Sequence, residues 1–330
     1  MGGEDRGQHP LWDIGCGHVT EVKSGPALQK AQGSELVMVM RRSGERAADF
    51  ARRHGVPAWT DNYLDVLTNP AIDAVYIATP PESHAFYTIE AARHGKAVYV
   101  EKPMATTAQE ARAMIAACRE HQVPLFVAYY RRGQPKFLKA RGQGAIGQVM
   151  SFQYLYATPP LEPIPDRPWL MDPKLSGGGL LYDVGSHMVD TTLMLLGEPE
   201  EVIGRSANLG RRWEVNDVSS ALFRLKNGIH GTMQFSCHAA ETIDQLWVFG
   251  SRGTLKLGIM NLEPVDLLTD GRRERITFEP LPHVQQPYIQ QVVYALQGQA
   301  DLNDSAALAL RTQEILEAID RSQTWRAPST

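Results

Sequence analysis

The stretch Leu36-Val37-Met38-Val39-Met40, followed at once by Arg41-Arg42-Ser43, decides how the first part of this 330-residue chain folds. Five consecutive apolar residues are typical of a strand that is buried on both faces, as the strands of parallel sheets are. Ser43 is a suitable N-cap for a helix that Gly55 would end. A buried strand that leads directly into a capped helix indicates one β–α unit of a parallel sheet.

The same alternation of short apolar runs and helical patterns continues on both sides of this stretch. Thr60 and Ser83 are expected to cap further helices, and Thr107 with Glu110 to form a capping box. Strands separated by helices predict a parallel sheet with right-handed crossovers. Residues 1–125 are therefore predicted to form a doubly wound, nucleotide-binding α/β domain, with another α/β fold and a different cofactor as the alternative. The expected strands are Leu11–Ile14, Leu36–Met40, Val56–Trp59, Asp73–Ala78, Ala97–Val100 and Leu125–Tyr129.

The pattern changes after residue 145. Hairpin turns are expected at Asn227-Gly228 and Asp270-Gly271, and consecutive hairpins favour antiparallel pairing. Residues 126–330 are therefore predicted to form a second α/β domain with a mostly antiparallel sheet. The expected strands here are Val149–Tyr156, Val218–Leu225, Ile229–Cys237 and Gln245–Phe249.

Composition excludes several classes of protein. Lys plus Arg number 33 and Asp plus Glu 37, so the net charge of −4 is unlike that of a general nucleic-acid binder. Apolar residues make up 43%, which is too many for a disordered chain, and no apolar run approaches the ~20 residues of a membrane span. Residues 1–10 lack the features of a secretory signal. The widely spaced Cys16, Cys118 and Cys237 favour a reducing cytoplasm over a disulfide framework.

A glycine turn, Gly15-Cys16-Gly17, follows the first expected strand. Glycines here let the backbone approach a pyrophosphate, which then faces the amides at a helix N-terminus. Thr20 stands where the G-x-G-x-x-G fingerprint has its third glycine, so an ordinary strand–helix turn is the alternative. The candidate cofactor contacts of this turn are Gly15, Cys16, Gly17, His18 and Val19.

The end of the second expected strand bears on the choice of cofactor. An Asp or Glu at this position would bind the ribose 2′-hydroxyl of NAD. This chain has Arg41, Arg42 and Ser43 instead, whose guanidinium and hydroxyl groups suit a 2′-phosphate. The sequence therefore favours NADP over NAD, and a solvated basic helix start is the alternative.

Glu101-Lys102-Pro103 lies at the carboxyl end of the fifth expected strand, the edge where ligands of such sheets bind. A lysine in a cleft can present its ammonium group to a carbonyl oxygen and exchange a proton with it. The proline fixes the local backbone, and its peptide bond is a candidate for the cis form. A surface lysine is the alternative.

The segment SGGGLLYDVGSHMVD, residues 176–190, holds the strongest group of candidate catalytic residues. Asp183 and His187 are four residues apart and are expected on one helix face, with Asp190 nearby. A carboxylate one turn from an imidazole can orient it as a proton relay for a substrate hydroxyl. A structural His–Asp pair is the alternative. No metal is expected, because the spacing lacks the further His or Cys ligands of a tetrahedral site.

Together these motifs resemble the Gfo/Idh/MocA family, which includes glucose–fructose oxidoreductase and inositol dehydrogenase. The resemblance implies that residues 1–125 form a Rossmann domain and that residues 126–330 form an α/β domain that binds substrate, with a large, mostly antiparallel open sheet that often serves in dimer contact. It also implies reversible hydride transfer between a nicotinamide and a hydroxyl-bearing carbon of a sugar, cyclitol or related polyol. The matching segments are GCG at 15–17, IATPPESH at 77–84, EKP at 101–103 and GGGLLYDVGSH at 177–187.

Carried over residue by residue, the resemblance makes Lys102 the acid/base group, with Asp183 and His187 completing the catalytic set at the reacting hydroxyl. The sequence departs from the family at Asp13, where the first strand has an apolar residue in relatives, and this puts the cofactor site in doubt. The cofactor contacts implied by the resemblance are Thr79, Pro80, His84, Glu101 and Lys102, with Arg131 and Trp169 as looser matches.

The leading hypothesis is thus an NADP-preferring oxidoreductase that acts on a small polyhydroxylated molecule, works in the cytoplasm and forms a homodimer or larger homo-oligomer. No nucleic-acid or membrane partner is expected. One alternative is an enzyme of the same type with a non-sugar substrate, such as a dihydrodiol, a cyclic diketone or a pigment. Another is a non-catalytic NADP-binding sensor, which the weak first strand favours and the presence of Lys102, Asp183 and His187 disfavours.

Overall fold

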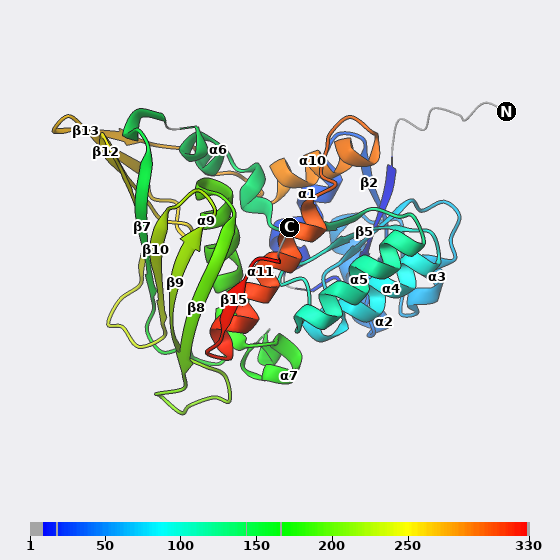
Figure 1. The fold of residues 1–330 in the computed structure, drawn as a ribbon. Coiled ribbons are helices and arrows are strands. Elements are labelled where there is room, and N and C mark those ends of the chain that lie inside the picture. The colour runs from blue at the N-terminus through cyan, green and yellow to red at the C-terminus, as the bar shows by residue number, and fades with distance from the viewer. Residues whose placement is uncertain (1–8, 18, 143, 166, 329–330) are drawn as a thin grey trace. The chain divides into compact units, whose positions relative to one another are not determined.

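The computed structural model describes residues 9–17, 19–142, 144–165 and 167–328, and the chain divides into two compact units (Figure 1). The first unit contains the chain up to Gly133 together with Leu281–Leu310, and the second contains Gln134–Pro280 and the chain from Arg311 onward. The sequence predicted a single boundary after residue 125. The chain instead returns to the first unit, because helix α10 (Gln286–Leu296) buries its apolar face in a core of that unit.

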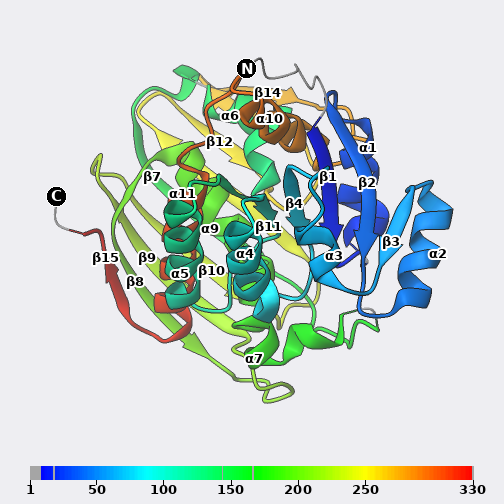
Figure 2. The same ribbon diagram turned by 90° about the vertical axis from the view of Figure 1, so that its right-hand side faces the viewer.

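The first unit is built on a six-stranded sheet in the order β3-β2-β1-β4-β5-β6, with every neighbouring pair parallel. Figure 2 shows β1, β2 and β3 side by side, with helix α2 (Gly44–His54) beside β3. The doubly wound parallel sheet expected from the sequence is confirmed. The strands are β1 His9–Ile14, β2 Ser34–Met40, β3 Ala58–Thr60, β4 Ala74–Ile77, β5 Ala97–Val100 and β6 Leu125–Val127.

Alternate residues of the central strands enter two separate cores, which explains their continuous apolar runs. On β4, Val75 and Ile77 join a cluster that also holds residues of α4 (His84–Arg93) and α5 (Ala108–Glu120). Ala74 and Tyr76 join a second cluster, together with residues of α1 (Gly25–Lys30) and α10. Both faces of the sheet are therefore buried, as a parallel sheet requires.

The helix starts follow the sequence in part. Ser43 accepts a hydrogen bond from the Arg46 amide and caps α2, and Thr107 and Glu110 form the expected capping box of α5. The prediction that Thr60 caps the next helix is wrong. Asn62 caps α3 (Tyr63–Leu67) through the Leu64 amide, because Thr60 still belongs to β3.

Ser83 does occupy the N-cap position of α4, but its side chain does not cap the helix. A 3-10 turn, Pro81–Ser83, precedes α4 and directs the Ser83 hydroxyl back to Thr79 Oγ1 at 2.8 Å and to the Pro80 carbonyl at 3.0 Å. The hydroxyl therefore closes the turn after β4 instead of satisfying a helix amide.

The second unit contains a nine-stranded sheet in the order β14-β13-β12-β11-β7-β10-β9-β8-β15. Its neighbouring pairs are antiparallel except β7 with β10, so the mostly antiparallel sheet is confirmed. Asn227-Gly228 and Asp270-Gly271 form the expected hairpin turns. The strands are β7 Val149–Ala157, β8 Pro199–Ala207, β9 Val218–Leu225, β10 His230–Ser236, β11 Ile243–Gly250, β12 Gly253–Leu257, β13 Val265–Thr269, β14 Arg272–Ile276 and β15 Thr324–Arg326.

Helices of the second unit pack on one face of this sheet. A single apolar cluster joins inward-facing strand residues such as Phe223 and Leu246 to Met188 and Val189 of α9 and to Leu316 of α11. No helix in the described part of the chain combines the length and hydrophobicity that crossing a membrane requires. The helices are α6 Pro135–Arg141, α7 Pro173–Ser176, α8 Gly179–Asp183, α9 Gly185–Leu196 and α11 Ser305–Asp320, whose first residues belong to the first unit.

Candidate functional site

The glycine turn after β1 brings three parts of the first unit together. Gly15 has φ +104°, and a Cβ atom there would lie 2.7 Å from Thr79 Cγ2 and 2.8 Å from the Thr79 amide nitrogen. The Gly15 amide also donates to the Met40 carbonyl at the end of β2 at 2.9 Å. Because only glycine fits this crossing of backbones, the turn has the form that close approach to a pyrophosphate needs. His18 lies outside the described residues.

Helical backbone begins directly after this turn. Val19 precedes a short π-helix, η1 (Thr20–Ser24), which continues into α1 at Gly25. A Cβ atom at Gly25 would lie 2.4 Å from the Thr20 carbonyl, so the junction of the two helices also requires glycine. Pro26 follows in the first turn of α1, where its missing N–H costs nothing.

The basic residues after β2 have different environments. Arg41 Nη1 donates to the Cys16 carbonyl at 3.1 Å, so its guanidinium holds the glycine turn. The Ser43 hydroxyl caps α2, whereas Arg42 is exposed. Arg42 is thus the exposed member of this group.

Glu101 forms a buried hydrogen-bonded cluster at the carboxyl end of β5. Its carboxylate is 5% exposed and accepts from the Tyr76 hydroxyl at 2.6 Å, from Gln285 Nε2 at 2.8 Å and from the Lys102 amide at 3.2 Å. Lys102 itself is half-buried, and the Lys102–Pro103 peptide bond is cis. The cluster fixes the backbone from which the Lys102 side chain projects, at the sheet edge that also carries the glycine turn.

His84 is fully buried and ties two backbone segments together. Its Nδ1 lies 3.0 Å from the Pro103 carbonyl and its Nε2 lies 2.8 Å from the Thr79 carbonyl. Burial lowers the pKa of His84 although these carbonyls favour the protonated ring. Because each ring nitrogen lies within hydrogen-bonding distance of a backbone oxygen, His84 links the backbone at Thr79 to the backbone at Pro103, the residue after Lys102.

Tyr130, directly after β6, lies among charged groups of the same sheet edge. Burial raises its pKa, but the nearby Arg131, Lys23 and Lys102 cations outweigh burial and lower it overall. Arg131 is buried, and its guanidinium carbon lies 5.1 Å from the centre of the Tyr130 ring. Three cations, Lys23, Lys102 and Arg131, therefore influence Tyr130 together with the Glu101 carboxylate.

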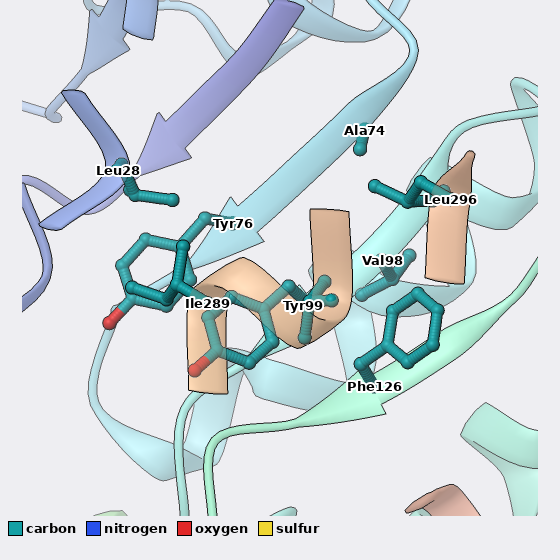
Figure 3. A pocket seen from close by; sticks show the side chains of 10 residues that line it. Leu28, Ala74, Tyr76, Val98, Tyr99, Phe126, Ile289 and Leu296 are labelled. Atoms are coloured by element: carbon teal, nitrogen blue, oxygen red, sulfur yellow. The ribbon is translucent and has the colours of Figure 1, made fainter. Parts of the chain in front are cut away.

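A small apolar cavity lies in the core of the first unit, between the sheet and α10 (Figure 3). Tyr76 and Tyr99 stack there with their ring centres 5.1 Å apart, and their hydroxyl groups point to the same side, away from Leu296. The Tyr76 hydroxyl is the one that reaches Glu101. The lining is almost entirely apolar and does not suit a dinucleotide, so the cavity is part of the packed core. The Tyr76 hydroxyl at its edge donates to Glu101.

The second unit supplies Asp183 and His187. The expected single helix is divided at Val184, with Asp183 ending α8 and His187 lying in the first turn of α9. Gly179, at φ +66°, starts α8 where a Cβ atom would lie 2.7 Å from Val215, so the glycine run permits this close packing. His187 is buried, and Asp183 is nearly so.

An arginine that the sequence did not single out pairs with Asp183. Arg167 Nη2 lies 2.9 Å from Asp183 Oδ2, and its guanidinium carbon lies 5.0 Å from the ring centre of Trp169. Both Arg167 and Trp169 belong to the proline-rich segment 158–176. In the sequence, this arginine could have been noticed because it stands two residues before Trp169 in a long segment for which no regular structure is expected, and such segments are often functional.

The sequence-predicted residues thus fall into two groups. The first unit gathers the glycine turn, Arg41, Thr79, Glu101 and Lys102 at one edge of the parallel sheet. The second unit holds Asp183 and His187, and Arg167 links Asp183 to the Trp169 ring. Sequence reasoning missed Tyr76 and Gln285, which bind Glu101 from β4 and from the segment before α10. Gln285 could not be found from spacing, because 184 residues separate it from Glu101.

The described His, Cys, Asp and Glu side chains also show how acidic groups and thiols are distributed. Among the described residues, no three His, Cys, Asp or Glu side chains gather as a metal site would require. Cys16, Cys118 and Cys237 all lie in the described part, are buried and form no disulfide there. Burial raises the pKa of the Cys118 and Cys237 thiols to about 12, which disfavours the reactive thiolate.

Comparison with known proteins agrees with this arrangement in both units. Residues 14–129 match the family model described as an oxidoreductase family with an NAD-binding Rossmann fold. Residues 138–256 match the model of the GFO/IDH/MocA C-terminal domain. The two matches cover the glycine turn, Lys102, Asp183 and His187.

Three known proteins illustrate the similarity. Oxidoreductase P35 of Formosa agariphila is 36% identical over 85% of this chain and 88% of its own. The D-xylose 1-dehydrogenase [NADP(+)] of Haloarcula marismortui is 29% identical over 81% of this chain and 75% of its own. The structure of a levoglucosan dehydrogenase in complex with NADH and levoglucosan has a TM-score of 0.85 at 22% identity, covering 98% of this chain and 100% of that one, which supports the fold.

Proposed function

The chain belongs to the GFO/IDH/MocA family of oxidoreductases, and from this membership we propose that it transfers a hydride reversibly between a nicotinamide cofactor and the hydroxyl-bearing carbon of a sugar, cyclitol or related polyol. A relative named as a D-xylose dehydrogenase supports the sugar-type substrate. When bound, the nicotinamide supplies the hydride or accepts it.

The observation that carries the proposal is the half-buried Lys102 next to the Glu101 cluster. Both lie at the carboxyl edge of the sheet, where the glycine turn also ends. In reduction the Lys102 ammonium donates a proton to the substrate oxygen, and in oxidation Lys102 takes the proton back. Asp183 and His187 bind the reacting hydroxyl and hold it in line with the hydride.

The residues present fit a dinucleotide. Gly15 permits the tight turn against Thr79 after β1, and the helical backbone from Val19 onward provides amides that can face a pyrophosphate. We propose NADP as the preferred cofactor, because the exposed Arg42 is suited to a 2′-phosphate and Arg41 supports the turn beside it. Arg42→Ala should then raise the KM for NADPH several-fold more than the KM for NADH.

The direct test is an NADPH-linked absorbance screen over sugars, inositols, anhydro-ketoses and dihydrodiols. Once a substrate is found, Lys102→Ala should lower kcat by at least about 100-fold while NADPH still binds, measured by cofactor fluorescence. Near-normal turnover by Lys102→Ala would remove Lys102 from the mechanism. Turnover confined to dihydrodiols or diketones would replace the proposed substrate class, and tight NADPH binding without turnover would favour a sensor.

We also propose that the protein acts in the cytoplasm and assembles as a homodimer or larger homo-oligomer through the open sheet of the second unit. The outer face of this sheet exposes Leu222 by 48% and Phe249 by 37%, and Trp247 stacks on Phe249 with ring centres 6.4 Å apart. Exposed apolar side chains on a sheet face favour burial against another protein surface.

A further inference from the structure

The ion pair between Arg167 and Asp183 joins the proline-rich segment to the end of α8, next to its junction with α9. Arg167 Nη2 and Asp183 Oδ2 are 2.9 Å apart, with the side chains 23% and 12% exposed. A pair that is mostly removed from water interacts more strongly than a pair on an open surface. The guanidinium therefore has a substantial influence on the charge and orientation of the Asp183 carboxylate.

The backbone around Arg167 holds the guanidinium in place. The Arg167 amide donates to the Ile164 carbonyl at 2.9 Å, and its own carbonyl accepts from the Leu170 amide at 3.1 Å. The short helix Pro168–Met171 follows at once, and Leu170 is buried in the core of the second unit. The Trp169 ring then lies beside the guanidinium. Arg167 is thus presented by a segment with defined geometry, which is what a positioning role requires.

We propose that Arg167 is a positioning residue for the reaction: it keeps the Asp183 carboxylate ionised and oriented toward the reacting hydroxyl. This inference rests on the proposed function, in which Asp183 binds that hydroxyl. An ionised carboxylate accepts a hydrogen bond from the hydroxyl, whereas a protonated one competes as a donor. Because the charge of Arg167 is balanced by Asp183, the pair favours a neutral polyol over a substrate that carries its own carboxylate.

A second arginine in the same unit provides a matched control. Arg212 binds Glu162 of the same proline-rich segment through two hydrogen bonds of 2.8 and 2.6 Å, and it lies over Trp213 at 5.5 Å. This pair also tethers the segment beside a tryptophan, but it does not involve Asp183. Comparison of the two arginines therefore separates tethering of the segment from positioning of the carboxylate.

The kinetic test uses Arg167→Met, Arg167→Lys and Arg212→Met. Arg167→Met should lower kcat about 10- to 100-fold, with the KM for NADPH unchanged, and move the acid limb of the pH–kcat profile to higher pH. The limb moves because a carboxylate that loses its neighbouring cation binds its proton more tightly. Arg167→Lys should restore part of kcat and return the limb toward its original position. Arg212→Met should change kcat less than about twofold.

Two kinetic results would overturn the proposal. Equal losses in Arg167→Met and Arg212→Met would mean that Arg167 only tethers the segment. A rise in KM confined to sugar acids, with neutral polyols unaffected, would mean that Arg167 binds a substrate carboxylate directly.

A readout that needs no turnover keeps this inference separate from the proposed function. The carboxyl carbon of Asp183, assigned by NMR through its loss in Asp183→Asn, should titrate at higher pH in Arg167→Met than in the unmodified protein or in Arg212→Met. An unchanged midpoint would refute control of Asp183 by Arg167. If the unmodified protein transfers no hydride to any substrate, the proposed function fails, and the titration still decides whether Arg167 controls Asp183.

Discussion

Glu101 shows at the scale of one residue how this protein places a charge inside its core. Removing a carboxylate from water costs several kcal/mol unless donors replace the lost hydration. Tyr76, Gln285 and the Lys102 amide provide those donors. Because the third donor belongs to Lys102 itself, the same bonds that stabilise Glu101 also fix the backbone of the proposed acid/base residue.

Replacing Gln285 by leucine tests this role. Gln285→Leu removes one donor from the buried carboxylate, so the free energy of unfolding should fall by about 1–3 kcal/mol and kcat should fall with it. The control is Gln290→Leu on the same helix, which breaks two exposed bonds to the Gln32 backbone. Urea unfolding and steady-state kinetics would measure both variants. Equal effects would contradict a specific role for Gln285.

Gly15 allows a second prediction at this scale. Gly15→Ala would place a Cβ atom 2.7 Å from Thr79 Cγ2 on a residue whose φ is +104°. The free energy of unfolding should therefore fall by about 1–3 kcal/mol, and NADPH binding should weaken by about tenfold or more. At Gly17 a Cβ atom would meet only the Gly15 carbonyl, at 3.4 Å. Gly17→Ala should therefore change the free energy of unfolding by less than about 1 kcal/mol. Indistinguishable unfolding curves for the two variants would contradict the crossing of backbones at Gly15.

At the scale of helices and strands, the sequence predicted the first sheet well, because β2, β4, β5 and β6 are short apolar runs between helical patterns. Helix starts were predicted where the capping residue also precedes the helical pattern, as at Ser43 and Thr107. The cap predicted at Thr60 was wrong, because Thr60 is the last residue of β3 and Asn62, two positions later, caps α3. Threonine is common both in strands and at N-caps, so the residue type alone does not separate the two roles. The exposed β14, with the sequence RRERI, gave no hydrophobic signal at all.

The first helical segment is tied to α2 by an ion pair that makes stability depend on pH. Hydrogen bonds from Arg53 and His54 lower the pKa of Glu21 from 4.5 to about 2, although burial acts against them. Since the folded pKa is depressed, this stabilisation is complete well above pH 4.5 and is lost as pH falls toward 2. Because Glu21 is partly exposed, we expect about 1–2 kcal/mol at pH 7, less than the full shift implies.

Glu21→Gln should therefore reduce the free energy of unfolding by about 1–2 kcal/mol at pH 7, measured by urea unfolding. The difference from the unmodified protein should narrow as the pH is lowered below about 4.5. A difference that stays constant between pH 7 and pH 3.5 would show that the effect of Glu21 is not electrostatic.

At the scale of the whole molecule, the sequence and the structure differ most in how the chain is divided between the two units. The change of pattern near residue 145 indicates a second unit, but no local signal shows that residues 281–310 return to the first. Gln285 and the apolar face of α10 contribute to the first unit for this reason. The candidate catalytic residues were found from motifs, whereas Gln285 and Arg167 depend on tertiary contacts that one sequence does not encode in any spacing.

The proposed oligomer gives a prediction at the scale of the whole molecule. Phe249→Lys combined with Leu222→Lys places two charges on the outer face of the open sheet, so sedimentation should show a shift from dimer or larger assembly to monomer. Leu262→Lys is the control, since Leu262 is 73% exposed in the segment between β12 and β13. A monomeric unmodified protein, or an assembly that survives the double change, would contradict an interface on this face.

Transfer of deuterium from the cofactor tests the central claim most directly. The protein is incubated with NADPH carrying deuterium at both C4 positions and with the carbonyl form of a substrate identified in the screen, and the product is analysed by mass spectrometry. We predict one deuterium on the new hydroxyl-bearing carbon, and at least about a 100-fold slower transfer by Lys102→Ala that still binds NADPH. Product without deuterium, or undiminished transfer by Lys102→Ala, would contradict the account.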